Sequence, residues 1–292
     1  MALFLTQLMN GIGSGAVYAS IALALVLVFR TTGILNFAQG EMALYSTYLV
    51  WFFTQRSVPV WIAILLAMII SFIGGAAIER ILIRPVEQAS PLVLVIVTIG
   101  MFLAINSIAQ VQFGNDIKIL PRAYPNKTWL PGGVQISSDT LVLVGVLLAE
   151  CLILYLLLNR TRIGLAFRAV ASNPESSRLV GVPVGRMLML GWAMAAAIGA
   201  LAGALVIAPV GLQGASMQEI LVYSFAAAAL GGFDSPLGAV VAGLIVGVAG
   251  TLTTQYLHAV HDIELVVPFG LILLVLLVRP SGLFGSRRVE RV

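Results

Sequence analysis

The chain has 292 residues, of which 60% are hydrophobic and only 10% are charged, and its mean hydropathy is +1.05. A soluble globular protein carries about 25% charged residues, because it must cover its surface with polar groups. The composition therefore excludes a soluble globular fold and favours a protein embedded in a lipid bilayer. The net charge is +4, but the basic residues are spread through short loops, so no nucleic-acid partner is expected.

Long apolar segments occur along the whole chain. A helix needs about 20 mostly apolar residues to cross the hydrocarbon core, which is about 30 Å thick. In chain order the segments that meet this requirement are 5–29, 37–53, 59–78, 91–113, 140–158, 187–210, 237–257 and 263–278. A ninth apolar segment, 220–231, is too short to span as an unbroken helix, and none of the nine alternates as a membrane strand would. The sequence predicts one all-α polytopic transmembrane domain over residues 1–292, with about eight or nine helices, some short or broken.

The distribution of basic residues sets the expected orientation, since loops rich in Lys and Arg stay on the cytoplasmic side. If all nine segments cross and the loop at 79–90 is cytoplasmic, twelve of the sixteen Lys and Arg residues lie inside. We therefore expect a multi-pass protein of the bacterial cytoplasmic (inner) membrane with a cytoplasmic C-terminus. The orientation makes 114–139 an external loop and 159–186 an internal one. The side of the N-terminus depends on whether the ninth segment and the first hairpin cross.

The internal loop at residues 159–186 has the pattern of two short helices joined by a sharp turn. Apolar residues recur at helical spacing in its first half, at Ile163, Ala166, Phe167 and Val170. Asn173 precedes Pro174, and a residue before proline avoids the α region, so the first helix should end there. Asn173 also suits the N-cap of a second helix that starts at Pro174, with Gly181 as the C′ residue after its end.

Several short motifs follow one another along the chain. They are Asn10-Gly11 with Tyr18-Ala19, Asn36-Phe37-Ala38-Gln39-Gly40-Glu41, Glu79-Arg80 with Arg84-Pro85, Ser90-Pro91-Leu92, Arg160-Thr161 with Gly164 and Arg168-Ala169, Gly231-Gly232 with Ser235 and Gly238-Ala239, and Arg279-Pro280 with Gly282-Leu283-Phe284-Gly285. Each motif alone is weak, but several in one order make chance similarity implausible. Over nearly its whole length the chain resembles the permease subunits of ATP-binding-cassette importers, in particular the LivH-type permeases of branched-chain amino acid systems.

The resemblance implies a permease fold without enzymatic activity, and it implies partners: a second related permease, two ATP-binding subunits and an external solute-binding protein. The chain has no G-x-x-x-x-G-K-[ST] loop for phosphates, and neither of its two lysines follows a glycine. No cofactor is expected on this chain, and ATP and Mg would be held by the partner subunits. The internal loop would then be the ATPase-coupling loop, whereas the simpler alternative is a basic loop that lies on the lipid headgroups. The residues expected to couple are Gly164, Ala166, Arg168, Ala169, Asn173, Pro174, Glu175, Arg178 and Gly181.

Polar residues at membrane depth are candidates for a substrate pathway, because unpaired polar groups are costly in hydrocarbon. These candidates are Asn36, Gln39, Glu41, Asn106, Glu150, Gly232 and Asp234. The breaks at 36–41 and 231–236 interrupt apolar segments, and paired interruptions are typical of a midplane binding site. The alternative is that both are inner-side turns, capped by Asn36 and Asp234, that line at most the inner exit. For Glu150 the alternative is a structural role against another helix, and Asn106 could either line water or bond another helix.

Two further patterns concern metal binding and helix packing. His258 and His261 lie close to Asp262 and Glu264, but in an outer loop without further ligands, so no metal site is expected. Glycines four residues apart let helix backbones approach closely in lipid. Such pairs occur at Gly11 and Gly15, at Gly199 and Gly203, and at Gly243 and Gly247.

Two functional hypotheses follow. In the first, the chain is the permease subunit of an ATP-driven importer of branched-chain or related amino acids. Relatives of such permeases also serve urea, amides and small carboxylates, so the substrate stays open. In the second, the chain is a self-sufficient channel or secondary carrier that uses residues 36–41 and Glu150. The coupling-like internal loop favours the first.

Overall fold

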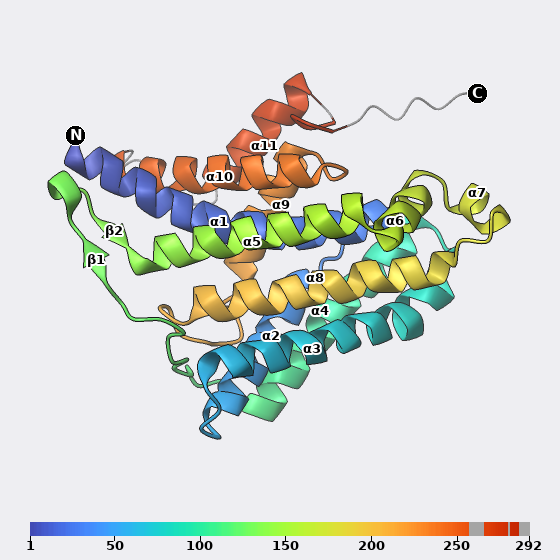
Figure 1. Ribbon diagram of the computed structural model, residues 1–292, viewed down its shortest axis with the longest axis horizontal. Helices are drawn as coiled ribbons and strands as arrows, with labels where there is room; N and C mark the ends of the chain where they lie inside the picture. The colour runs from blue at the N-terminus through green and yellow to red at the C-terminus, as the bar shows by residue number, and fades with distance from the viewer. Residues whose placement is uncertain (257–265, 280, 286–292) are drawn as a thin grey trace. The chain divides into compact units, whose positions relative to one another are not determined.

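The computed structural model describes residues 1–256, 266–279 and 281–285, and its helices are drawn in Figure 1. In chain order these helices are α1 (Ala2–Thr32), α2 (Gln39–Thr54), α3 (Val60–Ile78), α4 (Pro91–Phe113), α5 (Ser138–Arg160), α6 (Arg162–Ser172), α7 (Pro174–Leu179), α8 (Val184–Ile207), α9 (Gln218–Gly231), α10 (Pro236–Tyr256) and α11 (Val266–Val278). Two short antiparallel strands, β1 (Thr128–Trp129) and β2 (Ile136–Ser137), form a hairpin in the predicted external loop. His258, His261 and the C-terminal residues 286–292 lie outside the described residues.

All nine predicted apolar segments are helical where the structure describes them. Among the described residues, six stretches are long and apolar enough to cross a membrane: Ala2–Thr32, Val60–Val86, Pro91–Phe113, Ser138–Arg160, Val184–Ile207 and Pro236–Tyr256. The helices α2, α9 and α11 are shorter, with 16, 14 and 13 residues. The chain is therefore an all-α multi-pass membrane protein with some short helices, as the sequence predicted.

The end of α3 differs from the sequence prediction, which placed a loop at residues 79–90. The helix continues as a π-helical turn, η1 (Glu79–Ile83), and then a 3-10 turn, η2 (Arg84–Val86). A π turn joins residues five apart, which is the spacing of Glu79 and Arg84. Their side chains form an ion pair at 2.7 Å, so the charged residues extend the helix instead of ending it.

The chain divides into two compact units. Unit 1 comprises residues 1–26, 124–147 and 219–292, and unit 2 comprises residues 27–123 and 148–218, so the division falls within α1 and within α5. In unit 2 the helices α2, α3, α4 and α8 pack side by side (Figure 1). These helices carry most of the polar candidates named above.

Small residues let α8 pack closely inside unit 2. A Cβ added at Gly199 would lie 2.9 Å from Gln39 Nε2, and one at Gly203 would lie 2.7 Å from Thr47 Oγ1, both groups of α2. On another side of α8, Gly75 of α3 lies against the backbone of Trp192, which is fully buried. The helix α8 therefore packs closely against α2 and α3.

In unit 1 the glycine pairs of α1 and α10 meet each other. A Cβ added at Gly11 would lie 2.7 Å from the Cα of Val248, and one at Gly15 would lie 2.8 Å from the Cα of Leu244. A Cβ at Gly243 would in turn lie 2.7 Å from the Cα of Ala19. The two backbones are therefore in contact along this stripe, the arrangement that small residues permit between membrane helices.

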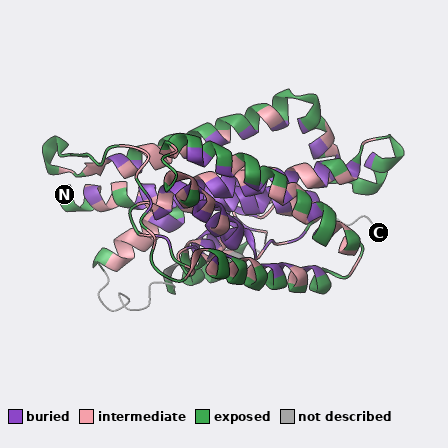
Figure 2. Ribbon diagram, turned by 90° about the horizontal axis from the view of Figure 1, so that it is seen from below, coloured by how far each residue is buried: buried purple, intermediate pink, exposed green. Residues whose placement is uncertain are grey.

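The outward faces of α3 and α4 are apolar. Ile73 on α3 is 62% exposed and Leu92 on α4 is 68% exposed, with further large aliphatic residues beside them. Figure 2 shows helices with buried residues along one side and exposed residues along the other. Such large apolar faces would be unstable in water, but hydrocarbon is a suitable solvent for them.

Candidate functional site

The break before α2 is closed by side-chain hydrogen bonds within unit 2. Asn36 Oδ1 accepts a hydrogen bond from the backbone N–H of Ala38 at 3.1 Å, and its Nδ2 donates to Gln39 Oε1 at 3.1 Å. Gln39 Nε2 in turn donates to the carbonyl oxygen of Ala195 on α8 at 2.9 Å. Asn36 therefore shapes the turn, and Gln39 fixes the start of α2 to α8.

Glu41, two residues after Gln39 on α2, forms a second polar cluster. Asn106 of α4 donates one N–H to Glu41 Oε2 and the other to the carbonyl oxygen of Gly214, both at 2.8 Å. Gln110, one turn after Asn106, donates to Asn106 Oδ1. The other carboxylate oxygen, Glu41 Oε1, is buried and has no hydrogen-bond partner within the described part of the chain. The cluster joins α2, α4 and the loop that precedes α9.

The burial of these side chains bears on the predicted pathway. Asn36, Gln39 and Glu41 are all 0% exposed, and Asn106 is half-buried. Groups that solvent does not reach cannot line an open water-filled path in the conformation described. In this conformation Gln39, Glu41 and Asn106 bond helices to one another, which for Asn106 is one of the two roles that the sequence left open.

The remaining polar candidates lie on other elements. Glu150 of α5 is 5% exposed, so its carboxyl group lies inside the protein. Gly232, at the break between α9 and α10, has φ +99 and packs against the backbone of Gly285, to which an added Cβ would approach within 2.7 Å. Asp234 lies beside the same glycine, since an added Cβ at Gly285 would come within 3.2 Å of Asp234 Oδ1.

The break between α9 and α10 is thus closed by the segment that follows α11. The backbone N–H of Leu283 donates to Leu230 O at 2.8 Å, and that of Phe284 donates to Gly231 O at 3.1 Å. Two motifs that lie about fifty residues apart in the sequence are therefore packing partners. Their glycines permit close backbone contact, and no substrate-binding side chain is needed to explain them.

The predicted two-helix segment of the internal loop is present, as α6 and α7. Asn173 Oδ1 accepts from the backbone N–H of Ser176 at 2.9 Å, so Asn173 is the N-cap of α7, and Pro174 is its first residue. After α7, Gly181 has φ +82, its N–H donates to Arg178 O, and the N–H of Val182 donates to Ser177 O. This pair of bonds is the Schellman motif, which ends the helix as predicted.

Two features of α6 were not predicted. Thr161 Oγ1 accepts from the backbone N–H of Gly164 at 3.0 Å, so Thr161 is the N-cap of α6. A Thr directly before the first helical residue is the usual sequence signal for such a cap. Gly164 itself lies against the carbonyl oxygens of Leu157 and Leu158 at the end of α5, leaving no space for a side chain. These contacts hold α6 firmly against α5.

One face of α6 is buried, but the segment also exposes apolar side chains. Phe167 and Val170 are 1% and 0% exposed, as their helical spacing predicted, and Ala166 and Ala169 are half-buried. Ile163, which shares this helical spacing, lies in the first turn of α6 and is 51% exposed. The apolar side chains that the segment exposes are Ile163, Leu165, Leu179 and Val180. Arg168 and Glu175 are exposed as well, so the segment offers a mixed apolar and charged surface.

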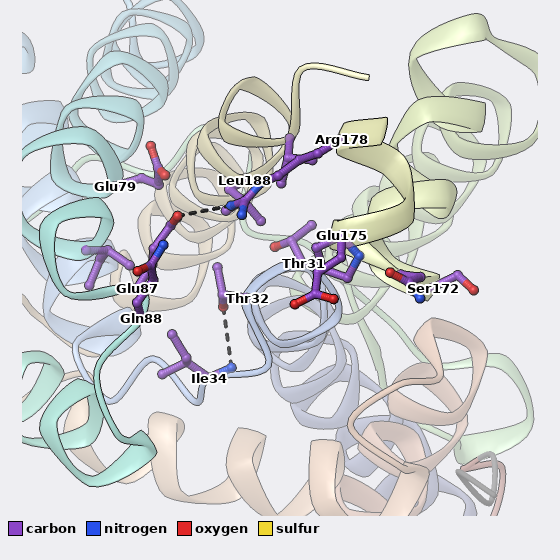
Figure 3. Close-up of a pocket in the computed structure, with 14 residues that line it drawn as sticks. Thr31, Thr32, Ile34, Glu79, Glu87, Gln88, Ser172, Glu175, Arg178 and Leu188 are labelled. Atoms are coloured by element: carbon purple, nitrogen blue, oxygen red, sulfur yellow. Dashed lines mark hydrogen bonds and ion pairs between the residues drawn. The ribbon is translucent and has the colours of Figure 1, made fainter. Parts of the chain in front are cut away.

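A hollow of about 490 Å³ lies between α7 and the ends of the neighbouring helices in unit 2. Figure 3 shows Glu79 and Glu87 on one side of it and Ser172 and Glu175 on the other. Arg178 of α7 forms an ion pair with Glu87 at 3.2 Å, which ties α7 to the turn between α3 and α4. Sequence reasoning did not find this pair, because its members are 91 positions apart.

A second tie joins α3 to α8 near the same hollow. The guanidinium group of Arg84 contacts both carboxylate oxygens of Glu79 and also donates to the carbonyl oxygen of Gly185 at 2.7 Å. Gly185 lies at the start of α8, six residues after the end of α7. Gly164 therefore holds the two-helix segment against α5, and the Arg178–Glu87 ion pair holds it to the turn between α3 and α4. The segment also lies next to the start of α8, which Arg84 fixes.

Comparison with known proteins identifies the kind of protein that carries this arrangement. The sequence matches the family described as "Branched-chain amino acid transport system / permease component" over residues 7–276. It is 32% identical to the high-affinity branched-chain amino acid transport system permease protein LivH of Salmonella typhimurium, in an alignment that covers 99% of this chain and 98% of that protein. It is 30% identical, with the same coverage, to the corresponding permease BraD of Pseudomonas aeruginosa. A probable LivH permease of Methanocaldococcus jannaschii is 27% identical over 91% of this chain and 87% of that protein.

No solved structure matches the chain. The family match covers most of the chain, and the alignments with the bacterial relatives run through nearly all of it. These alignments include the two-helix segment and the motifs at Gly231-Gly232 and Gly282-Leu283-Phe284-Gly285. The family is one of transport permeases and not of enzymes. The chain therefore belongs to the permease components of branched-chain amino acid transport systems.

Proposed function

We propose that this chain is the membrane-spanning permease subunit of an ATP-driven importer that moves branched-chain or chemically related amino acids. The observation that carries the proposal is the family membership, with relatives named as branched-chain amino acid permeases along their full length. The chain contains no phosphate-binding loop of the Walker type, so the energy must arrive through another subunit. Two ATP-binding subunits would hold the ATP and Mg, and this chain would hold no cofactor.

The two-helix segment α6–α7 is the proposed docking surface for the ATP-binding subunits. It exposes four apolar side chains beside Arg168 and Glu175, and such mixed patches are typical of protein interfaces. A force applied to this surface would reach the membrane helices through the contacts of Gly164 with α5 and of Arg178 with Glu87. The proposal places this segment, and the C-terminus, on the cytoplasmic side of the bacterial inner membrane.

The other proposed partners are a second, related permease subunit and an external solute-binding protein. The predicted external loop, with its β1–β2 hairpin and the exposed Trp129, is the surface on which the binding protein would dock. Selectivity between branched-chain amino acids and urea, amides or small carboxylates would then rest mainly with that external protein.

Purification of the tagged chain from its native membrane tests this proposal. We expect it to bring down two ATP-binding subunits and a second permease, and the reconstituted complex to take up L-leucine only with ATP and the binding protein. Recovery of a lone homo-oligomer that transports without ATP would contradict the proposal and favour a channel or secondary carrier. Uptake of urea or an amide, but not of leucine, would contradict the substrate assignment alone.

Removal of a charge from the docking surface tests the role of α6–α7. Arg168→Ala and Glu175→Ala are each expected to lower ATP-driven uptake by about tenfold, since truncation of an interface residue at a hot spot costs about 2 kcal/mol or more. Both side chains are exposed, so insertion and folding should not change. Arg56→Ala, which removes an exposed charge from the turn between α2 and α3, outside both proposed docking surfaces, serves as the control. Normal uptake and normal recovery of the ATP-binding subunits in both variants would refute the assignment.

A further inference from the structure

A second hollow, of about 250 Å³, lies in unit 1 among α1, α9 and α10. Its hydrogen-bonding side chains come from all three helices: Gln7, Glu219, Thr251, Thr254 and Gln255. The rings of Tyr18 and Tyr223, which also line it, are stacked with their centroids 4.7 Å apart. None of these residues was a candidate in the sequence, because single polar residues near helix ends give no distinctive pattern.

The hollow faces a polar side of a membrane helix. On α10, Thr251 follows Gly247 by four residues, about one turn, and Thr254 follows Thr251 by three. The three residues therefore share one face of the helix. The α10 helix is long and apolar enough to cross a membrane. Glu219 and Gln255, which also line the hollow, are exposed, and such groups are costly toward hydrocarbon, so the hollow is expected to border an aqueous space.

The lining residues offer both donors and acceptors: Gln7 Nε2 donates to Gln255 Oε1 at 2.9 Å, so the amide N–H groups of Gln255 remain as donors, whereas the threonine and glutamate oxygens only accept. Thr251 Oγ1 donates its hydrogen to Gly247 O at 3.0 Å, and Thr254 Oγ1 donates to Gly250 O at 3.1 Å. A hydroxyl group has one hydrogen and two lone pairs, so both threonine oxygens remain free only to accept. The ionised carboxylate of Glu219 also only accepts.

The charge of the lining favours a positively charged ligand group. Glu219 contributes a negative charge, and no Lys, Arg or His is among the described residues that line this hollow. The tyrosine rings favour a cation over an anion. A group with several N–H donors and a positive charge, namely a primary ammonium group, matches acceptors of this kind through charge-assisted hydrogen bonds.

We propose that this hollow binds the ammonium group of the amino acid during its passage through the permease. The inference rests on the proposed function and adds to it a site on this chain that distinguishes amino acids from carboxylates. The volume is below the range of about 300–1,000 Å³ that holds drug-sized ligands, and it suits a small metabolite. A carboxylate without an ammonium group finds no cationic partner among the described lining residues and is repelled by Glu219.

Thiol labelling tests the charge preference of the hollow directly. Cys151 is the only cysteine of the chain, so Cys151→Ser provides a background without thiols. On it, Thr254→Cys places a thiol in the hollow, and Thr253→Cys places one on the neighbouring residue, which does not line it. The purified whole transporter in detergent is treated with a cationic aminoethyl or an anionic sulfonatoethyl methanethiosulfonate. For each variant, the labelling rate with the cationic reagent is divided by the rate with the anionic reagent. We expect this ratio to be about tenfold higher for Thr254→Cys than for the Thr253→Cys control.

Two further measurements separate ligand binding from a general charge effect. In the first, adding Glu219→Gln to the Thr254→Cys variant should remove its preference for the cationic reagent. In the second, L-leucine should slow labelling of the Thr254→Cys variant, whereas 4-methylpentanoate should not. Equal rates with the two reagents, or no protection by leucine, would overturn the inference. If the inference fails in this way but the wild-type complex still takes up leucine with ATP, the proposed function is unaffected. Absence of ATP-driven uptake would refute the proposed function itself.

Discussion

Substitution of Gly75 by alanine is expected to destabilise the protein strongly, whereas the same substitution at Gly74 should leave its stability unchanged or slightly higher. An added Cβ at Gly75 would lie 2.6 Å from the carbonyl oxygen of Trp192 and 2.8 Å from Ala196 Cβ, both on α8. At Gly74 no atom lies within 4 Å of the added Cβ. The two positions therefore differ in packing although they are neighbours in the same helix.

The sizes of the two effects follow from different physical terms. Overpacking a close contact costs about 1–3 kcal/mol, and more when backbone has to move. Replacing glycine by alanine in a helix interior gains roughly 0.5–1 kcal/mol, because the unfolded chain loses freedom. Thermal unfolding of the purified protein in detergent, followed by the loss of the monodisperse peak, measures the difference. Equal unfolding temperatures for Gly74→Ala and Gly75→Ala would show that α3 and α8 are not in close contact.

The sequence was most informative where the cause of a structure is local. The apolar segments, the C-terminal end of α6, the N-cap Asn173 and the C′ residue Gly181 all depend on residues within one or two turns. Composition and spacing reveal such causes directly. The glycine pairs were also correct as signs of close packing, but their spacing could not tell that Gly11 and Gly15 meet Gly243 and Gly247.

What the sequence missed depends on residues far apart in the chain. The Arg178–Glu87 ion pair and the double hydrogen bond of Asn106 to Glu41 and Gly214 have no local pattern. For the same reason the sequence could not show that Gln39 and Glu41 bond to partners on α8 and α4. The hollow of unit 1 escaped notice because its members lie on three helices, each with one or a few polar residues.

Loss of the Arg84 side chain is expected to have the second large effect, and it should act on both stability and coupling. Glu79 is 1% exposed, and Arg84 contacts both of its carboxylate oxygens. Arg84→Met leaves a buried carboxylate without its partner, which costs about 3–5 kcal/mol, because desolvation of the charge is no longer compensated. The variant also loses the bond to Gly185 O, so the start of α8 is released next to α7.

A double variant separates the two consequences of losing Arg84. Arg84→Met combined with Glu79→Gln removes the unpaired charge, so most of the thermal stability should return, since replacing both members of a buried pair costs little. The bond to Gly185 is still absent, and ATP-driven uptake should therefore stay low although the protein is stable. Asp116→Asn, which removes the exposed member of a pair with Lys118 whose atoms lie 3.7 Å apart, should leave the thermal stability unchanged. A double variant no more stable than Arg84→Met alone would show that the ion pair is not the source of the instability. One with full uptake would show that the Gly185 contact does not transmit the motion of α7 to α8.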